Sequence, residues 1–106
     1  MESDWRTFRD MVPKLRERYL ADCNAWLADL LNDSKQNETE RFWGALRKME
    51  HEAKVLRRCL DGHSPSTMQQ YMKMMIYSGM LKKEDMAVFS EELQKQVSFL
   101  FEEVRR

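Results

Sequence analysis

One stretch of the chain, residues 41–60, limits most strongly the folds that this sequence can adopt. Six apolar residues in it recur at alternating steps of four and three, which places them along one side of an α-helix. This spacing follows the heptad pattern of a helix that packs nearly parallel or antiparallel to a partner helix. We call the stripe the seam, and it consists of Phe42, Leu46, Met49, Ala53, Leu56 and Leu60.

A second apolar pattern with the same period runs over residues 3–32 and predicts a long helix before the seam. Pro13 lacks an N–H group and crowds the preceding turn, so we expect it to kink this helix or to start a new one. Residues 1–12 would then form a separately oriented arm. A polar cluster at 32–37 predicts a tight connection, with Asn37 as the cap of the next helix.

The two long helices are therefore expected to form an antiparallel hairpin around this connection. Positions whose numbers sum to about 70 would then lie opposite each other. Trp26 would face Gly44, whose missing side chain would let the indole approach the backbone.

The rest of the chain is also predicted to be helical. Gly62 is expected to end the seam helix in the left-handed conformation. Ser64 and Pro65 are a favourable N-cap and first helical residue, which predicts a third helix over 65–78. Residues 83–104 are expected to form either one helix or a short helix at 83–89 followed by a final helix.

Only three glycines and two prolines occur among the 106 residues, which favours long helices over a turn-rich β fold. No alternating strand pattern is present. We therefore expect an all-α fold, a single bundle-like domain over residues 1–106. It would have four helices, or five with the short helix at 83–89.

Charge narrows the possible functions. The 18 Lys and Arg residues balance 18 Asp and Glu residues, which argues against non-specific polyanion binding but permits a local basic patch. Arg47, His51, Lys54 and Arg58 follow the helical period on the side away from the seam. A solvated helix face explains this stripe, and nucleic-acid binding through Arg47, Lys54 and Arg58 is the alternative.

Methionine is unusually frequent, with nine residues, and several lie in the predicted third helix. Flexible, polarizable side chains suit a surface that adapts to an apolar partner, although they also fill ordinary cores. We expect a partner-binding surface shared by this helix and the last one, with Met68, Met72, Met75 and Phe99 as its candidate residues.

The sequence offers no catalytic, metal-binding or cofactor-binding constellation. His51 and His63 are the only histidines, and neither has a nucleophile and an orienting acid at a suitable spacing. Cys23 and Cys59 lack zinc-site spacing and are expected far apart as free thiols. With a charged start and no long apolar run, we expect a cytoplasmic protein that does not enter a membrane.

Together these features predict a small helical adaptor or regulatory module that binds another protein and has no catalytic activity. The apolar inventory exceeds what one small core requires, so we also expect a homodimer built with the first and last helices. A nucleic-acid-associated regulator is the alternative function.

Overall fold

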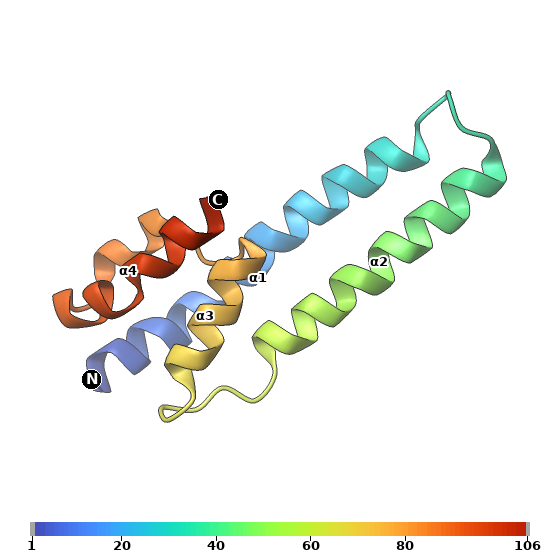
Figure 1. Cartoon of the computed structure of the whole chain (residues 1–106). Coiled ribbons are helices and arrows are strands. Elements are labelled where there is room, and N and C mark those ends of the chain that lie inside the picture. The colour runs from blue at the N-terminus through green and yellow to red at the C-terminus, as the bar shows by residue number, and fades with distance from the viewer. Residues whose placement is uncertain (1, 106) are drawn as a thin grey trace.

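The computed structural model describes residues 2–105, which form four α-helices and one 3₁₀ helix and contain no β-strand. Helices α1 (Glu2–Leu31) and α2 (Glu38–Leu60) form a long antiparallel hairpin (Figure 1). Helix α3 (Met68–Ser78), the 3₁₀ helix η1 (Lys83–Val88) and helix α4 (Glu91–Arg105) gather at one end of it. We call these three elements the head. The predicted all-α fold and the hairpin of its first two helices are confirmed.

The hairpin projects well beyond the head. The molecule is 51 Å long but only 17 Å across its shortest axis. In Figure 1 the turn between α1 and α2 lies far from α3 and α4, at the opposite end of the molecule. Of the hairpin, only its base therefore packs against the head.

Helix α1 continues through Pro13, so the expectation that this proline starts a new helix is wrong. The proline removes the hydrogen bond to the carbonyl of Arg9, but both residues are exposed and water can satisfy that carbonyl. On the opposite side of the helix, Phe8 and Leu15 are both fully buried in the core. Packing on each side of the proline therefore holds the helix together.

Helix α2 begins and ends as its sequence predicts. The side chain of Asn37 accepts a hydrogen bond from the Glu40 N–H at 2.8 Å, and Glu40 accepts one from the Asn37 N–H at 3.0 Å. At the other end Gly62 has φ +85°, a conformation that favours glycine. A Cβ atom here would also lie 2.8 Å from the Tyr71 hydroxyl, so a side chain would displace this tyrosine.

Helix α3 begins three residues later than predicted. The Ser64 N–H donates to the Thr67 hydroxyl at 3.1 Å, and the Ser64 carbonyl accepts from the Thr67 N–H at 3.1 Å. These bonds close a turn around Pro65, and the helix starts only at Met68. Gly79 ends α3 at φ +82°, as its position predicted. The break between η1 and α4 excludes the single helix over 83–104 and confirms the short one.

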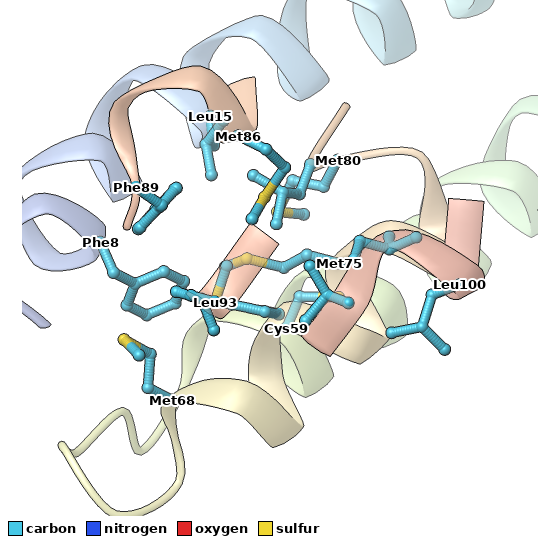
Figure 2. Packing of buried hydrophobic residues seen from close by; sticks show 14 residues of the cluster. Phe8, Leu15, Cys59, Met68, Met75, Met80, Met86, Phe89, Leu93 and Leu100 are labelled. Atoms are coloured by element: carbon cyan, nitrogen blue, oxygen red, sulfur yellow. The ribbon is translucent and has the colours of Figure 1, made fainter. Parts of the chain in front are cut away.

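The core lies where α1, the end of α2 and the head meet. Figure 2 shows that Phe8 and Leu15 of α1 point toward Leu93 of α4 and the methionines of the head. Methionines supply much of this core, since unbranched side chains adapt to an irregular space between short elements. The fully buried members with the largest side chains are Phe8, Leu15, Met72, Met75, Ile76, Met80, Leu81 and Leu93.

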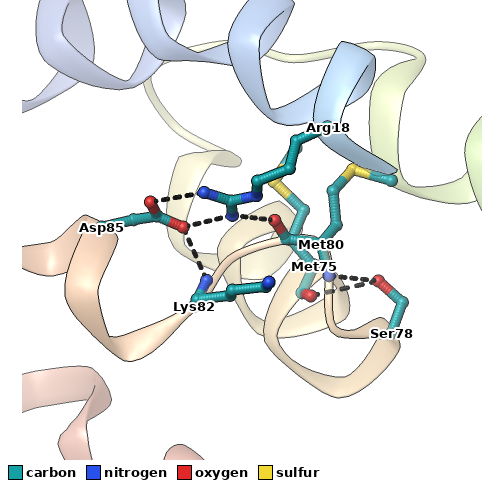
Figure 3. A network of polar contacts seen from close by, with 6 residues as sticks. All are labelled: Arg18, Met75, Ser78, Met80, Lys82 and Asp85. Carbon is teal, nitrogen blue, oxygen red and sulfur yellow. Dashed lines mark hydrogen bonds and ion pairs between the residues drawn. The ribbon is translucent and has the colours of Figure 1, made fainter. Parts of the chain in front are cut away.

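A polar latch ties η1 to the middle of α1 (Figure 3). The Arg18 guanidinium donates two hydrogen bonds to Asp85, at 2.6 and 2.9 Å, and a third to the Met80 carbonyl at 2.9 Å. Asp85 also accepts from the Lys82 N–H at 2.7 Å. Burial alone would raise the pKa of Asp85, but the hydrogen bonds from Arg18 and Lys82 outweigh it and hold this pKa below its ordinary value.

Candidate interaction surface

The side of α2 that faces α1 is not the seam. The Arg41 side chain donates to the Leu31 carbonyl, Lys48 lies 4.8 Å from the centre of the Trp26 ring, and Glu52 contacts two residues of α1. Three buried or half-buried residues, Ala45, Val55 and Cys59, continue the same line along α2. Each residue of the resulting stripe comes one position before a residue of the seam. The stripe is Arg41, Ala45, Lys48, Glu52, Val55 and Cys59.

One residue along an α-helix is a rotation of about 100°. The seam is therefore turned roughly 100° away from the line of contact with α1. Phe42 is 60% exposed and Met49 is 55% exposed, whereas the inner members Leu56 and Leu60 pack partly against the core. In the outer half of the hairpin, the most regular apolar stripe of the sequence thus exposes Phe42 and Met49, while Leu46 between them is half-buried.

The register of the hairpin differs from the prediction. Residue 19 contacts 52 and residue 31 contacts 41, while 30 approaches 44, 26 lies against 48 and 23 contacts 52, so paired numbers sum to between 71 and 75, slightly above the predicted 70. Helix α2 extends about one turn beyond α1 at the tip, and the connection runs beside that turn. Leu30, not Trp26, is the α1 side chain nearest Gly44, so the expected approach of the indole is wrong.

Helix α1 contributes to the same open face. Its contacts with α2 come from Tyr19, Cys23, Trp26 and Leu30, at the same alternating spacing. In two antiparallel helices, the positions one residue after each contact turn to the same side of the pair. On α1 this row is Leu20, Asn24, Leu27 and Leu31. The open face of the hairpin therefore joins this row to the seam.

The head covers the other side of the hairpin. Arg18, which binds η1, lies one residue before the contact residue Tyr19. His51 and Arg58 lie one residue before Glu52 and Cys59, and they line a cavity of about 330 Å³ together with residues of α3. The head thus lies on the side of the hairpin away from the outer part of the seam, while the inner members Leu56 and Leu60 pack partly against the core.

The tip of the hairpin carries a second apolar feature, a cleft of about 480 Å³ on the same side as the head. Trp26 and Trp43, both about half exposed, contribute their indoles to it, and Arg47 lines its polar side. Phe42 packs edge-on against Trp43, with ring centres 5.0 Å apart. Large aromatic side chains are therefore exposed on both sides of the tip.

A small polar cluster fixes the hairpin between the seam and the head. The Tyr19 hydroxyl donates to Glu52 at 2.7 Å, and the Cys23 thiol donates to the same carboxylate oxygen at 3.1 Å. Burial alone would raise the pKa of Glu52, but these two hydrogen bonds lower it below its ordinary value. Burial and the bond to Glu52 raise the pKa of Cys23 to about 11, so this thiol is protonated and poorly nucleophilic at neutral pH.

Replacing the carboxylate by an amide should expose this role as a change in pH dependence. We expect Glu52→Gln to lower the free energy of unfolding by about 1–2 kcal/mol at pH 7, because a neutral acceptor binds the two donors less strongly. The pKa of Glu52 is lower in the folded chain than in the unfolded one. The stabilisation is therefore present above about pH 4.3 and disappears as the pH falls through the folded value.

Urea unfolding at pH 7 and pH 3 measures this effect, with the exposed neighbour Glu50→Gln as the control. The gap between wild type and Glu52→Gln should narrow at pH 3, while Glu50→Gln follows wild type at both. A gap of equal size at the two pH values would show that the charge of Glu52 is irrelevant.

The predicted basic stripe is exposed in the structure. Arg47, His51, Lys54 and Arg58 all present accessible side chains along α2, on the side away from the seam. Arg47 lines the cleft at the tip, while Arg58 lies near α3, so the stripe runs from the tip to the head.

The predicted partner-binding residues are divided by the fold. Met68, Met72 and Met75 are buried in the core and present no surface to a partner in this conformation. Phe99 is 57% exposed and lines a cleft of about 470 Å³ between η1 and α4. The seam is the sequence feature that could have indicated the exposed surface, because no other helix in the described part of the chain covers Phe42 and Met49.

The cysteines and His63 contact other residues within the fold. Cys23 and Cys59 are buried free thiols, as predicted: the Cys23 thiol contacts Glu52 of α2, and the Cys59 thiol contacts the Ser78 hydroxyl of α3. The His63 ring packs edge-on between Phe8 and Tyr71 and its Nε2 lies 2.6 Å from the Cys59 carbonyl. Among residues 2–105, no three His, Cys, Asp or Glu side chains gather as metal ligands would.

None of the helices in this part of the chain has both the length and the apolar character needed to cross a membrane. Comparison with known protein families, curated proteins and solved structures gives no significant match for this chain.

Proposed function

We propose that this protein is a helical interaction module that binds another protein through the open face of its hairpin and has no catalytic role. The single observation that carries this proposal is the exposure of the outer seam on a hairpin that projects beyond the head. An apolar row with heptad spacing is suited to another helix rather than to water.

The size of the open face supports the same conclusion. The outer part of the seam, from Phe42 to Ala53, is about 17 Å long, and two adjacent helices are about 20 Å wide, giving a projected area on the order of 300 Å². The largest apolar patches of ordinary monomers are about 300–600 Å², and patches of that size often mark binding sites. The exposed aromatic residues at the tip enlarge the apolar area further.

Two matched pairs of substitutions test this function. The double variant Phe42→Ser and Met49→Ser removes apolar side chains from the seam, while Val88→Ser and Phe99→Ser removes two from the head. Phe42 and Phe99 are almost equally exposed, at 60% and 57%. Both variants should keep wild-type helicity, because none of the four residues belongs to the core.

The chains that co-purify with the tagged protein after crosslinking in its native cells provide the measurement. We expect the seam variant to lose them and the head variant to keep them. Equal retention by both variants would refute a binding role for the seam. Selective loss in the head variant would instead place the binding surface at Phe99, in the cleft between η1 and α4.

A nucleic-acid-associated regulator is the second candidate function. The observation that favours it is the continuous exposure of Arg47, Lys54 and Arg58 along α2. Phosphate contacts release counterions, so binding to a DNA or RNA duplex through these residues would weaken steeply as salt rises. The zero net charge of the chain gives this function less support than the seam gives to protein binding.

A further inference from the structure

We propose that a second copy of this chain covers the seam, with the two α2 helices antiparallel, so that two hairpins pack into a four-helix bundle. This inference rests on the proposed function, because it names the partner of the same surface. It also moves the expected homodimer contact from the first and last helices to the first and second.

The seam is compatible with its own copy in this orientation. Its positions are symmetric about residue 51, so a two-fold axis there pairs Phe42 with Leu60 of the second copy. The same axis pairs Leu46 with Leu56, and the long side chain of Met49 with the small Ala53. Contacts across a two-fold axis are reciprocal, so each pair occurs twice. Every apolar position of the seam thereby meets another apolar position.

The uncharged character of the outer part of the open face also favours a second copy of the chain as its partner. Beside the outer part of the seam, the row that α1 contributes contains three leucines and one neutral polar residue, Asn24, so this part of the open face carries no charge, whereas the row continues toward the base with Glu17. A partner must therefore present a similarly uncharged, elongated face made by parallel rods. A second hairpin offers this face with the same length and the same spacing.

The area is sufficient for a specific dimer. Over the full length from Phe42 to Leu60, each copy would contribute a footprint on the order of 500 Å², so two copies would bury about 1,000 Å² together, which is near the lower limit for specific interfaces. The bulk of the head lies on the opposite side of each hairpin, and Leu56 and Leu60 remain half-buried rather than covered. The four helices would enclose the seam as the core of a bundle.

Sedimentation equilibrium of the full chain at micromolar to millimolar concentration tests the dimer. We expect wild type to reach twice the mass of one chain, and Met49→Glu to raise the dissociation constant by about 100-fold or more, because an unpaired carboxylate would be buried in each copy. Val88→Glu introduces the same charge at an exposed position on η1 and should leave the dimer unchanged. A wild-type chain that stays monomeric throughout this range would overturn the proposal.

Engineered cysteines test the orientation independently of affinity. With antiparallel seams, a Met49→Cys and Ala53→Cys variant brings two thiol pairs together at the two-fold axis, and mild oxidation should link the chains. The single variant Phe42→Cys places its thiols about 27 Å apart in this arrangement and should not link. Crosslinking through position 42 alone would indicate parallel seams and refute the proposed packing.

Circular dichroism and the natural thiols supply the controls. The variants should keep wild-type helicity, and the wild-type chain should not link under the same oxidation because Cys23 and Cys59 are buried. If wild type is monomeric but the seam variant still loses its co-purifying chains, the binding function stands and only the second-copy assignment fails. If seam substitutions change neither the sedimentation equilibrium nor the set of co-purifying chains, both proposals fail.

Discussion

Phe8→Ala should lower the free energy of unfolding by about 3–5 kcal/mol, the range found for phenylalanine truncation in a packed core. Phe8 is fully buried, and its ring packs edge-on against His63 with 5.1 Å between the ring centres. It is thus the anchor that joins the start of α1 to the connection before α3. A loss of this size is a large fraction of the total stability of a domain of this length.

Urea unfolding followed by circular dichroism measures the change, and Phe42→Ala is the matched control. Phe42 has the same side chain but is 60% exposed, so we expect its truncation to change the stability of the monomer by only about 0.5 kcal/mol. The comparison is made at a protein concentration below any self-association. Similar losses from both variants would contradict the division of the molecule into a packed base and an open seam.

Asp4→Ala should be the second large effect, with a loss of about 2–4 kcal/mol. Asp4 is 2% exposed and accepts two hydrogen bonds from Ser90, one from its N–H at 2.9 Å and one from its hydroxyl at 2.6 Å. The Ser90 hydroxyl in turn accepts from the Leu93 N–H at 3.2 Å and so caps α4. Removing the carboxylate leaves these donors unpaired and releases α4 from the start of α1.

Asp10→Ala is the control for this prediction, because Asp10 is an exposed acid on the same helix. Its removal should change the midpoint of thermal unfolding very little, while Asp4→Ala lowers it by many degrees. Asp4→Asn should lie between the two, since an amide retains one acceptor oxygen. A neutral effect of Asp4→Ala would show that the contact with Ser90 contributes nothing to stability.

Local sequence signals predicted the local structure well. Asn37 and Gly79 were expected to begin and end helices, and each does so through its own side chain or backbone conformation; Gly62 adopts the expected left-handed conformation just after Asp61, whose extended backbone ends α2. Such caps depend on a few neighbouring residues, so the sequence contains what is needed to predict them. The turn at Ser64 was less accurate, because its hydrogen bond to Thr67 competes with the helix start that Pro65 favours.

Contacts between helices were harder to predict, as the side of α2 that packs against α1 illustrates. The seam and the stripe one residue before it have the same periodicity, and apolar character favoured the seam as the contact with α1. The structure uses the other stripe, because the polar ends of Arg41, Lys48 and Glu52 find partners on α1. Those partners lie in another helix, so the periodicity of α2 could not indicate them.

The methionines illustrate a similar ambiguity. Their chemistry suits both a core and an adaptable surface, and the sequence did not indicate whether other parts of the chain would cover α3. Burial by Phe8, Leu15 and Leu93 decided the question for Met72 and Met75. Met49, in contrast, lies on the open face, although the apolar residues around it in the sequence are more regularly spaced than those around Met72 and Met75.

This contrast supplies the most direct test of the central claim, which is that the seam rather than the methionine core forms the contact between molecules. The methyl signals of selectively labelled methionines can be followed by NMR as the wild-type chain is concentrated. The seam predicts that the Met49 signal shifts or broadens while those of Met68, Met72 and Met75 stay unchanged. Movement of the three core signals with a constant Met49 signal would contradict it.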